Sequence, residues 1–303
     1  MYAVMIICAS RRTDIPAFHA EWMMNRLKDG HVLVRNPVCR NVVYDVNLTP
    51  ESVDCIVFIT KDPRPMIPYL DELDSMGIAY TFQITITPYC KNIEPAVPFV
   101  ADITDAFRII SKHIGPIRTT WRYDPIIFNR YMNLAYHRKW FNLISRELEG
   151  TTDRCIFSFL DTYSHMNNLF RSATDSEIEE TATYIARTAK NYGMEPCCCC
   201  PDRNLTYTGV SVRGCIDGIQ MEKLGVPWKK QTSPVREWCR CIRNIDIGAY
   251  GTCNHRCLYC YAQRSDLVIN CDPTSEMLGG RLMPDDHIKK IADCHLPRIT
   301  DYL

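Results

Sequence analysis

The sequence predicts an α/β fold, built as a (β/α) barrel that is complete or partial and has six to eight strands. From residue 1 to about residue 196, short apolar runs alternate with helical stretches of ten or more residues. This pattern is typical of βαβ units and a parallel sheet. Beyond residue 196 the periodicity fades, and Gly, Pro and Cys become dense. We therefore expect a barrel domain over residues 1–196 and a cysteine-rich, cluster-binding segment over residues 197–303 that packs on it. A doubly wound open sheet is the alternative, because strand order cannot be derived from one sequence.

Each expected element is bounded by local signals. Polar residues follow the apolar runs, and Gly77, Gly115 and Gly193 close three of the helical stretches, as glycine does at helix C-termini. The expected strands are residues 3–9, 31–34, 55–59, 79–86, 117–121 and 155–160, with a seventh near residues 195–198. The expected helices are residues 18–27, 66–76, 103–114, 133–148 and 176–192, and a short helix over residues 216–224 follows.

Composition and charge limit the class of protein. Lys plus Arg and Asp plus Glu both number 35 in 303 residues, so the overall charge favours neither nucleic acid nor an acidic membrane surface as a partner. No apolar run has transmembrane length, and the start of the chain lacks an export signal. The chain has 17 cysteines. We expect a reducing, cytoplasmic setting in which the clustered thiols bind metal.

Charged and hydrogen-bonding residues follow nearly every expected strand. In parallel α/β barrels the carboxyl ends of the strands lie on one face, and active sites form there. Alternatively, polar loop starts only set turns. A basic pocket suited to carboxylates or phosphates would form from Arg11, Arg12, Arg35, Lys61 and Arg122. The residues that we expect to bind and orient a substrate are Arg12, Asp14, Lys61, Gln83, Arg122 and Asp124.

Three cysteines of the C-terminal segment, Cys253, Cys257 and Cys260, follow a C-x3-C-x2-C spacing. Thiolates this close in sequence can each bind a different iron of one cubane cluster, which leaves the fourth iron without a cysteine from this loop. An iron without a protein ligand is an open coordination position, comparable to the open position of catalytic zinc sites. The spacing therefore predicts a metal centre that can take part in chemistry.

A second group of cysteines lies upstream of this loop. One residue of Cys197–Cys200, together with Cys215, Cys239 and Cys241, would form a four-thiolate set. Consecutive side chains of an extended segment point to opposite faces, so the run of four cannot bind one cluster without strain. Four thiolates give every iron of a cluster a cysteine ligand, which suits electron transfer or a structural role. A structural zinc site is the alternative. Five other cysteines lie in or beside apolar stretches and are expected in the core: Cys8, Cys39, Cys55, Cys90 and Cys155.

Three further residues lie within or beside the loop. His255 stands between Cys253 and Cys257, and we expect an exposed loop histidine there. Tyr259 and Tyr261 flank Cys260. A ring at either position could pack against a cofactor or hold the loop on the barrel.

The loop resembles the C-x3-C-x-aromatic-C motif of the radical S-adenosylmethionine (SAM) superfamily, and with Tyr261 it resembles the cluster loop of spore photoproduct lyase and its relatives. The resemblance implies a [4Fe–4S] cluster whose open iron binds SAM, and reductive cleavage of SAM to a 5′-deoxyadenosyl radical. Two features depart from the superfamily: the loop comes after six or seven strands, and no convincing glycine-rich SAM motif follows it. The implied cofactor-binding residues are Cys253, Cys257, Tyr259 and Cys260.

The chain also resembles the domain-of-unknown-function 1848 family from about residue 10 to residue 263. The shared blocks are SRRTDIPAFH, VLVRNP, DCIVFITKDP, WRYDPI, the CID at Cys215–Asp217, and IDIGAYGTCNHRCLYCYA. The resemblance implies a barrel with a radical-SAM-like cluster loop at its C-terminal end. By comparison with the family, Cys199 is the expected first cysteine of the four-thiolate set, and Cys200 is nearly as suitable.

We therefore expect a radical SAM-type enzyme with a [4Fe–4S] cluster on the three-cysteine loop and a second one on Cys199, Cys215, Cys239 and Cys241. Its substrate would be a small molecule or a peptide, and its electron donor a protein such as flavodoxin or ferredoxin. A non-catalytic structural or binding protein that holds zinc or an iron–sulfur cluster is the alternative. A phosphate-ester hydrolase ranks last, because histidine is absent from the expected strand ends.

Overall fold

The computed structural model of the chain describes residues 4–161, 166, 169–230, 237–262, 269 and 271–291. Its main element is an eight-stranded sheet with the order β10-β1-β4-β5-β6-β7-β8-β9, in which all neighbouring strands are parallel. The α/β class and the parallel sheet expected from the sequence are confirmed. The strands are β1 (Ile6–Ala9), β4 (Cys55–Thr60), β5 (Tyr80–Thr85), β6 (Thr119–Ile126), β7 (Arg154–Phe159), β8 (Glu195–Cys198), β9 (Ser211–Val212) and β10 (Ile245–Asp246).

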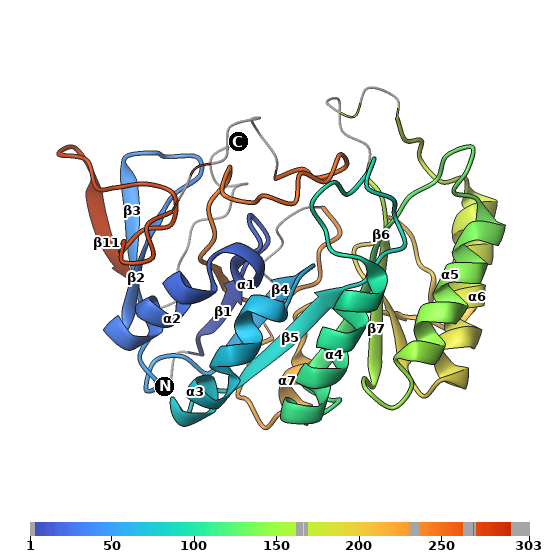
Figure 1. Cartoon of the computed structure of the whole chain (residues 1–303), viewed down its shortest axis with the longest axis horizontal. Helices are drawn as coiled ribbons and strands as arrows, with labels where there is room; N and C mark the ends of the chain where they lie inside the picture. Colours follow the sequence, from blue (N-terminus) through green and yellow to red (C-terminus); the bar gives the residue numbers. More distant parts are fainter. Residues whose placement is uncertain are drawn as a thin grey trace.

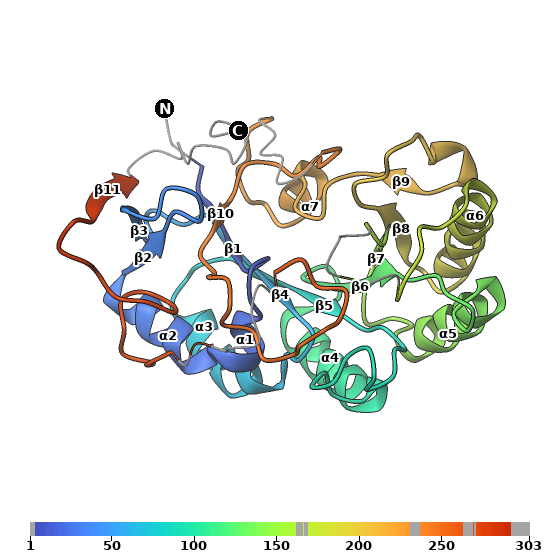
Figure 2. The same cartoon turned by 90° about the horizontal axis from the view of Figure 1, so that it is seen from above.

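The sheet is curved and open (Figures 1 and 2). Seen from above, its strands follow an arc, with helices α1 to α6 along the convex side and α7 near the opening (Figure 2). The outermost strands β9 and β10 do not pair with each other. From β1 to β9 the strands follow one another in sequence order, without the reversal of a doubly wound sheet. This arrangement is consistent with a partial barrel.

Most helices lie close to their expected positions. Asn133 and Thr174 cap two of them with their side chains, and Thr174 forms a capping box with Glu177. The helix expected over residues 66–76 begins instead as the 3-10 helix η1, since Pro68 has no N–H for an α-helical hydrogen bond. The helices are α1 (Ile15–Phe18), α2 (Ala20–Asp29), η1 (Arg64–Tyr69), α3 (Leu70–Ser75), α4 (Val100–Ile114), α5 (Leu134–Glu147), α6 (Asp175–Asn191), η3 (Thr206–Thr208) and α7 (Gly218–Lys223). In the described part of the chain, none is long and apolar enough to cross a membrane.

The strand expected at residues 31–34 exists, but its expected place in the barrel is wrong. It is β2 (His31–Arg35), which pairs antiparallel with β3 (Val42–Asn47) in a separate three-stranded sheet completed by β11 (His287–Ile291). The chain reverses after β2 because the Asn36 side chain accepts hydrogen bonds from the backbone N–H groups of Val38 (2.8 Å) and Cys39 (3.0 Å). A helical crossover to a parallel neighbour therefore does not form.

Both faces of the sheet are buried, which explains the nearly continuous apolar runs of its strands. One face packs against the helices. On the other face, Ile6, Val57 and Ile156 contact a cluster that contains Ile216 and Met221 of the C-terminal segment. This segment, which also supplies β9 and β10, packs against the same sheet, and the domain boundary at residue 196 stays a prediction.

The cysteines expected in the core divide into two groups. Cys8, Cys55 and Cys155 are fully buried on β1, β4 and β7. The expectation is wrong for Cys90, which is exposed in the long connection between β5 and α4, and Cys39 is only half-buried. A loop position beside apolar residues does not ensure burial, because loops run over the surface.

The buried residue His137 makes the stability of the fold depend on pH. It is buried on α5; its Nε2 donates to the carbonyl of Ile127 at 2.8 Å, and the Tyr123 hydroxyl lies 2.9 Å from Nδ1. Burial lowers the pKa of His137 to about 4. Because the unfolded chain binds this proton at a higher pH, the contribution to stability is complete above about pH 6.5 and is lost as the pH falls toward 4.

We expect the unfolding free energy to fall by about 2 kcal/mol more between pH 7 and pH 5 in the wild type than in His137→Gln. Urea unfolding at both pH values measures the difference. An equal pH dependence in the two proteins would contradict it.

Candidate functional site

A cavity of about 620 Å³ lies at the carboxyl ends of the strands. Its wall includes residues that follow or end β1, β4, β5, β6, β7 and β8, together with residues of the C-terminal segment. This is the face on which parallel barrels carry their active sites. Eight cysteines lie along it: Cys199, Cys200, Cys215, Cys239, Cys241, Cys253, Cys257 and Cys260.

Most of the substrate-binding residues expected from the sequence lie together in this wall, and Gln83 lies behind it. The Gln83 side chain accepts a hydrogen bond from Arg122 at 2.8 Å and donates one to the Cys215 carbonyl at 2.7 Å. Arg35, expected in the basic pocket, belongs to β2 and pairs with Asp286 at 2.7 Å, so that expectation is wrong. The expected residues in the wall are Arg12, Asp14, Lys61, Arg122 and Asp124.

Three cations of the cavity are already paired with carboxylates. Arg12 Nε lies 3.2 Å from Asp246, Lys61 Nζ lies 2.7 Å from the buried Glu94, and Arg122 pairs with Asp124. Burying unpaired charges is costly, which favours such compensation. The charge that these three cations offer an anion is therefore smaller than the sequence suggested.

Asp246 at the end of β10 fixes the loop that follows β1. Its carboxylate accepts hydrogen bonds from the Ser10 hydroxyl (2.8 Å) and the Arg11 backbone N–H (2.8 Å). Gly248 lies so close that an added Cβ would be 1.9 Å from the Ser10 Oγ. The close approach of β10 to β1 thus requires glycine at position 248.

The three-cysteine loop closes one side of the cavity. The Leu258 N–H donates to the Ile93 carbonyl at 3.0 Å, and the Ala96 N–H donates to the His255 carbonyl at 3.3 Å. The Tyr259 hydroxyl donates to the Glu94 carboxylate, which also accepts from Lys61. Tyr259 is thereby anchored within the protein beside Cys257.

His255 is 3% exposed, so the expectation of an exposed loop histidine is wrong. Its Nε2 donates to Asp14 Oδ2 at 2.8 Å. The same oxygen accepts the backbone N–H of Lys61 at 2.7 Å, and Oδ1 accepts the N–H of Ala17 at 3.1 Å. Asp14 therefore connects the three-cysteine loop to the segments that follow β1 and β4.

Burial keeps the thiols of Cys253 and Cys257 protonated at neutral pH. It raises the pKa of Cys253 to about 12 and raises that of Cys257 well above its usual value, although Lys61 acts in the opposite direction on Cys257. A metal ion deprotonates the thiols that it binds, because it replaces the proton as the positive partner. Metal binding at this loop would therefore release protons.

The cysteines of the four-thiolate set lie in a chain of contacts. The sulfurs of Cys215 and Cys241 are 3.3 Å apart, Cys199 contacts Cys215, and Cys239 contacts Cys241. Hydrogen bonds from Cys199 and Cys241 hold the pKa of Cys215 well below its usual value. Within the described ranges, no group of three or more His, Cys, Asp or Glu side chains is arranged around a single metal ion.

Two neighbouring cysteines of the run line the same cavity. Cys200 has φ 51°, and its sulfur lies 3.6 Å from that of Cys199. This left-handed residue ends the extended strand, so the alternation expected for consecutive side chains stops there. Cys199 and Cys200 thus both remain available as the first ligand.

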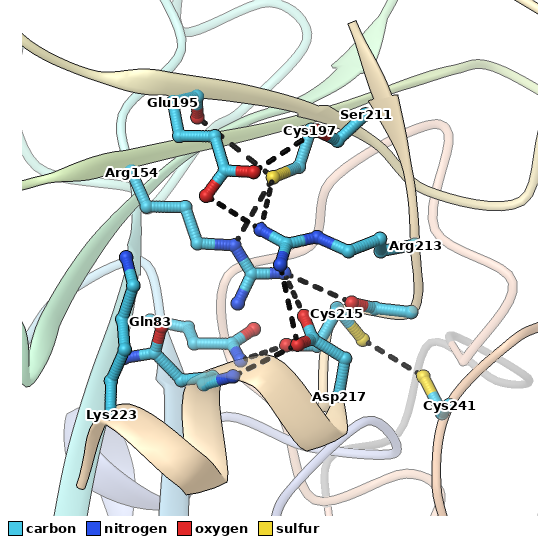
Figure 3. Close-up of polar contacts among 12 residues, drawn as sticks. Gln83, Arg154, Glu195, Cys197, Ser211, Arg213, Cys215, Asp217, Lys223 and Cys241 are labelled. Atoms are coloured by element: carbon cyan, nitrogen blue, oxygen red, sulfur yellow. Dashed lines mark hydrogen bonds and ion pairs between the residues drawn. The ribbon is translucent and has the colours of Figure 1, made fainter. Parts of the chain in front are cut away.

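Cys197 points instead into a network of charged residues beside Cys215 (Figure 3). Its sulfur lies 3.4 Å from Arg154 Nε and 3.3 Å from Arg213 Nη2. Arg154, which is fully buried, also pairs with Asp217 at 2.6 Å and donates to the Gly214 carbonyl at 3.0 Å. The network therefore holds the Gly214–Asp217 turn that presents Cys215, while Gln83 holds the Cys215 carbonyl from the other side.

Sequence reasoning missed several of these residues, although each carried a signal. Asp246 is a charge between two isoleucines, Arg154 directly precedes an apolar strand, and Glu94 follows an isoleucine in a proline-rich loop. A charge within an apolar run calls for a buried partner. Such partners could not be identified from the sequence, because they lie far away along it.

A family model described as "Domain of unknown function (DUF1848)" matches residues 6–262. The match includes every strand of the eight-stranded sheet and all eight cysteines of the cavity. No curated protein matches the chain.

The buried ion pair between Arg154 and Asp217 supplies a stability test. In Arg154→Met, the only cation left beside Asp217 in the described part of the chain is Arg213, at 3.8 Å, so we expect a loss of about 3–5 kcal/mol in unfolding free energy. The matched control is Arg138→Met, which breaks the exposed 2.9 Å pair with Glu180 and should cost below about 1 kcal/mol. Urea unfolding measures both, and equal losses would contradict the assignment.

Proposed function

We propose, from the premise that the chain belongs to the DUF1848 family, that it is an iron–sulfur enzyme of the radical SAM type. Cys253, Cys257 and Cys260 would hold a [4Fe–4S] cluster whose open iron binds SAM. When bound, the cluster and SAM supply hydrogen-atom abstraction by a 5′-deoxyadenosyl radical. The substrate, a small molecule or a peptide, would bind in the cavity at the strand ends.

One observation carries the proposal: the three-cysteine loop and the strand-end residues line the same cavity. A cluster needed only to stabilise the fold would not have to face such a cavity. Its volume of about 620 Å³ lies within the range of small-molecule sites. The loop is also held by buried polar contacts through His255 and Tyr259, as a site that orients reactants requires.

The donor set of the loop fits an iron–sulfur cluster. The cavity wall includes all three cysteines, and Cys253 accepts backbone hydrogen bonds from Asp14 and His255. Hydrogen bonds to cysteine sulfur are one of the ways in which proteins tune such clusters. Thiolates rather than carboxylates or imidazoles also favour iron–sulfur clusters or zinc over hard cations.

The chain's own residues would position the substrate and exclude water. Arg122 and Asp124 face the cavity as a pair, and Ser158 donates to Asp124. Arg12, which is held by Asp246, lines the same cavity. Lys61 and Asp14 act mainly by fixing the loop, and Gln83 acts through its hydrogen bond to Arg122.

We extend the proposal to the second set of cysteines and to the setting of the enzyme. A second [4Fe–4S] cluster would bind Cys199, Cys215, Cys239 and Cys241, in the cysteine-rich segment that fills the open side of a partial (β/α) barrel. Its place in the same cavity wall suits electron transfer. An electron donor such as flavodoxin or ferredoxin would serve the enzyme in the cytoplasm.

Anaerobic reconstitution followed by reduction in the presence of SAM tests the proposal. We expect 5′-deoxyadenosine from the wild type and only background from Cys257→Ala, because an iron then lacks its thiolate. Cys90→Ser, at an exposed position away from the cavity, should keep the wild-type yield. A reconstituted cluster that does not cleave SAM under reduction would contradict the proposal.

Metal analysis separates the enzyme from a structural metal protein. We expect about eight iron and eight sulfide per anaerobically purified chain, because each four-iron cluster contributes four of each. Cys215→Ala should lose about half of both. Zinc without iron or sulfide would favour the structural protein.

A further inference from the structure

Arg11 differs from the other cations of the cavity. Arg12, Lys61 and Arg122 each have a carboxylate within ion-pair distance, whereas Arg11 has none among the residues that the structure describes. Its Nη1 donates to the neutral side chain of Asn244 at 2.7 Å. Its Nη2 is buried and has no hydrogen-bond partner in the described part of the chain.

Three of the four groups that act electrostatically on this guanidinium are sulfurs. They are Cys8, Cys241 and Cys215, and the carboxylate of Asp246 acts on it more weakly. Cys241 and Cys215 belong to the four-thiolate set. Arg122 contacts the thiol of Cys215 and interacts with Cys199. Both arginines line the cavity with these cysteines. Arg11 lies in the loop after β1, and Arg122 lies on β6.

A buried guanidinium nitrogen without a hydrogen-bond acceptor destabilises the fold unless an anionic acceptor binds it. Four thiolates around a [4Fe–4S] core carry a net negative charge, and their sulfurs accept hydrogen bonds. Such a cluster accounts for the unpartnered Nη2 and for the lack of a carboxylate within ion-pair distance of Arg11 among the described residues. Asn244 would hold the guanidinium in place without neutralising it.

We propose that Arg11, assisted by Arg122, is the counter-ion of a cluster on Cys199, Cys215, Cys239 and Cys241 and raises its reduction potential. Adding an electron makes the cluster more negative, so a fixed positive charge favours the reduced form. Arg122 contributes less, because Asp124 already neutralises part of its charge. The proposal rests on the second cluster of the proposed function and assigns it a redox role rather than a structural one.

The test uses the full chain with Cys253, Cys257 and Cys260 replaced by alanine, so that only the second cluster remains. A redox titration followed by electron paramagnetic resonance gives its midpoint potential. Arg11→Gln should lower the ratio of reduced to oxidised cluster at least tenfold at a given potential, which is about 59 mV for one electron. Arg11→Lys keeps the charge and should stay within threefold of the parent. Arg138→Gln, on the far helix α5, should leave the ratio unchanged.

A second variant guards against an Arg11→Gln protein that does not assemble its cluster. Asn244→Leu removes the acceptor that holds Arg11 and should lower the ratio in the same direction by a smaller factor. An unchanged midpoint in whichever of these variants carries a cluster would overturn the proposal, as would zinc in place of iron at this set. Because the loop cysteines are absent from these proteins, the outcome does not depend on SAM cleavage. A failure of the radical SAM assignment is therefore distinguishable from a failure of this proposal.

Discussion

The carboxylate of Asp14 joins three parts of the chain that the cavity requires. It caps α1 through the Ala17 N–H, and it accepts hydrogen bonds from the backbone N–H of Lys61 after β4 and from the His255 ring of the three-cysteine loop. All three contacts are buried or partly buried, where each hydrogen bond to a charged group is worth most. The late segment that carries the cysteines is thereby fixed against the first strand of the sheet.

Elsewhere in the cavity wall, too, single buried charged groups hold more than one part of the chain in place. Glu94 receives both Lys61 and the hydroxyl of Tyr259, so one buried carboxylate positions a strand-end cation and the loop aromatic. Arg154 and Gln83 hold the turn around Cys215 from opposite sides. The two sets of cysteines therefore depend on contacts from different strands, and the sheet sets their separation. Among the described cations of the wall, Arg11 differs in having no carboxylate within ion-pair distance, and the groups that act most strongly on its charge are the sulfurs of Cys8, Cys241 and Cys215.

Much of the fold could be predicted because apolar runs followed by polar residues mark parallel strands, and the strand-end residues Arg12 and Arg122 were found in this way. The same rule placed Arg35 wrongly, since the hairpin after it depends on the side chain of Asn36, a local turn that periodicity does not report. The roles of Arg154 and Glu94 could not be predicted from the sequence, because they depend on partners far away along it. The burial of His255 likewise requires Asp14, which lies at the other end of the chain.

The central claim is that both sets of cysteines hold iron–sulfur clusters that face one cavity. Anomalous diffraction above and below the iron edge, on crystals grown anaerobically from reconstituted protein, tests it most directly. The account predicts two separate iron peaks, one beside Cys253, Cys257 and Cys260 and one beside Cys215 and Cys241. A zinc signal at either set, or no iron at the three-cysteine loop of a protein that otherwise keeps this fold, would contradict it.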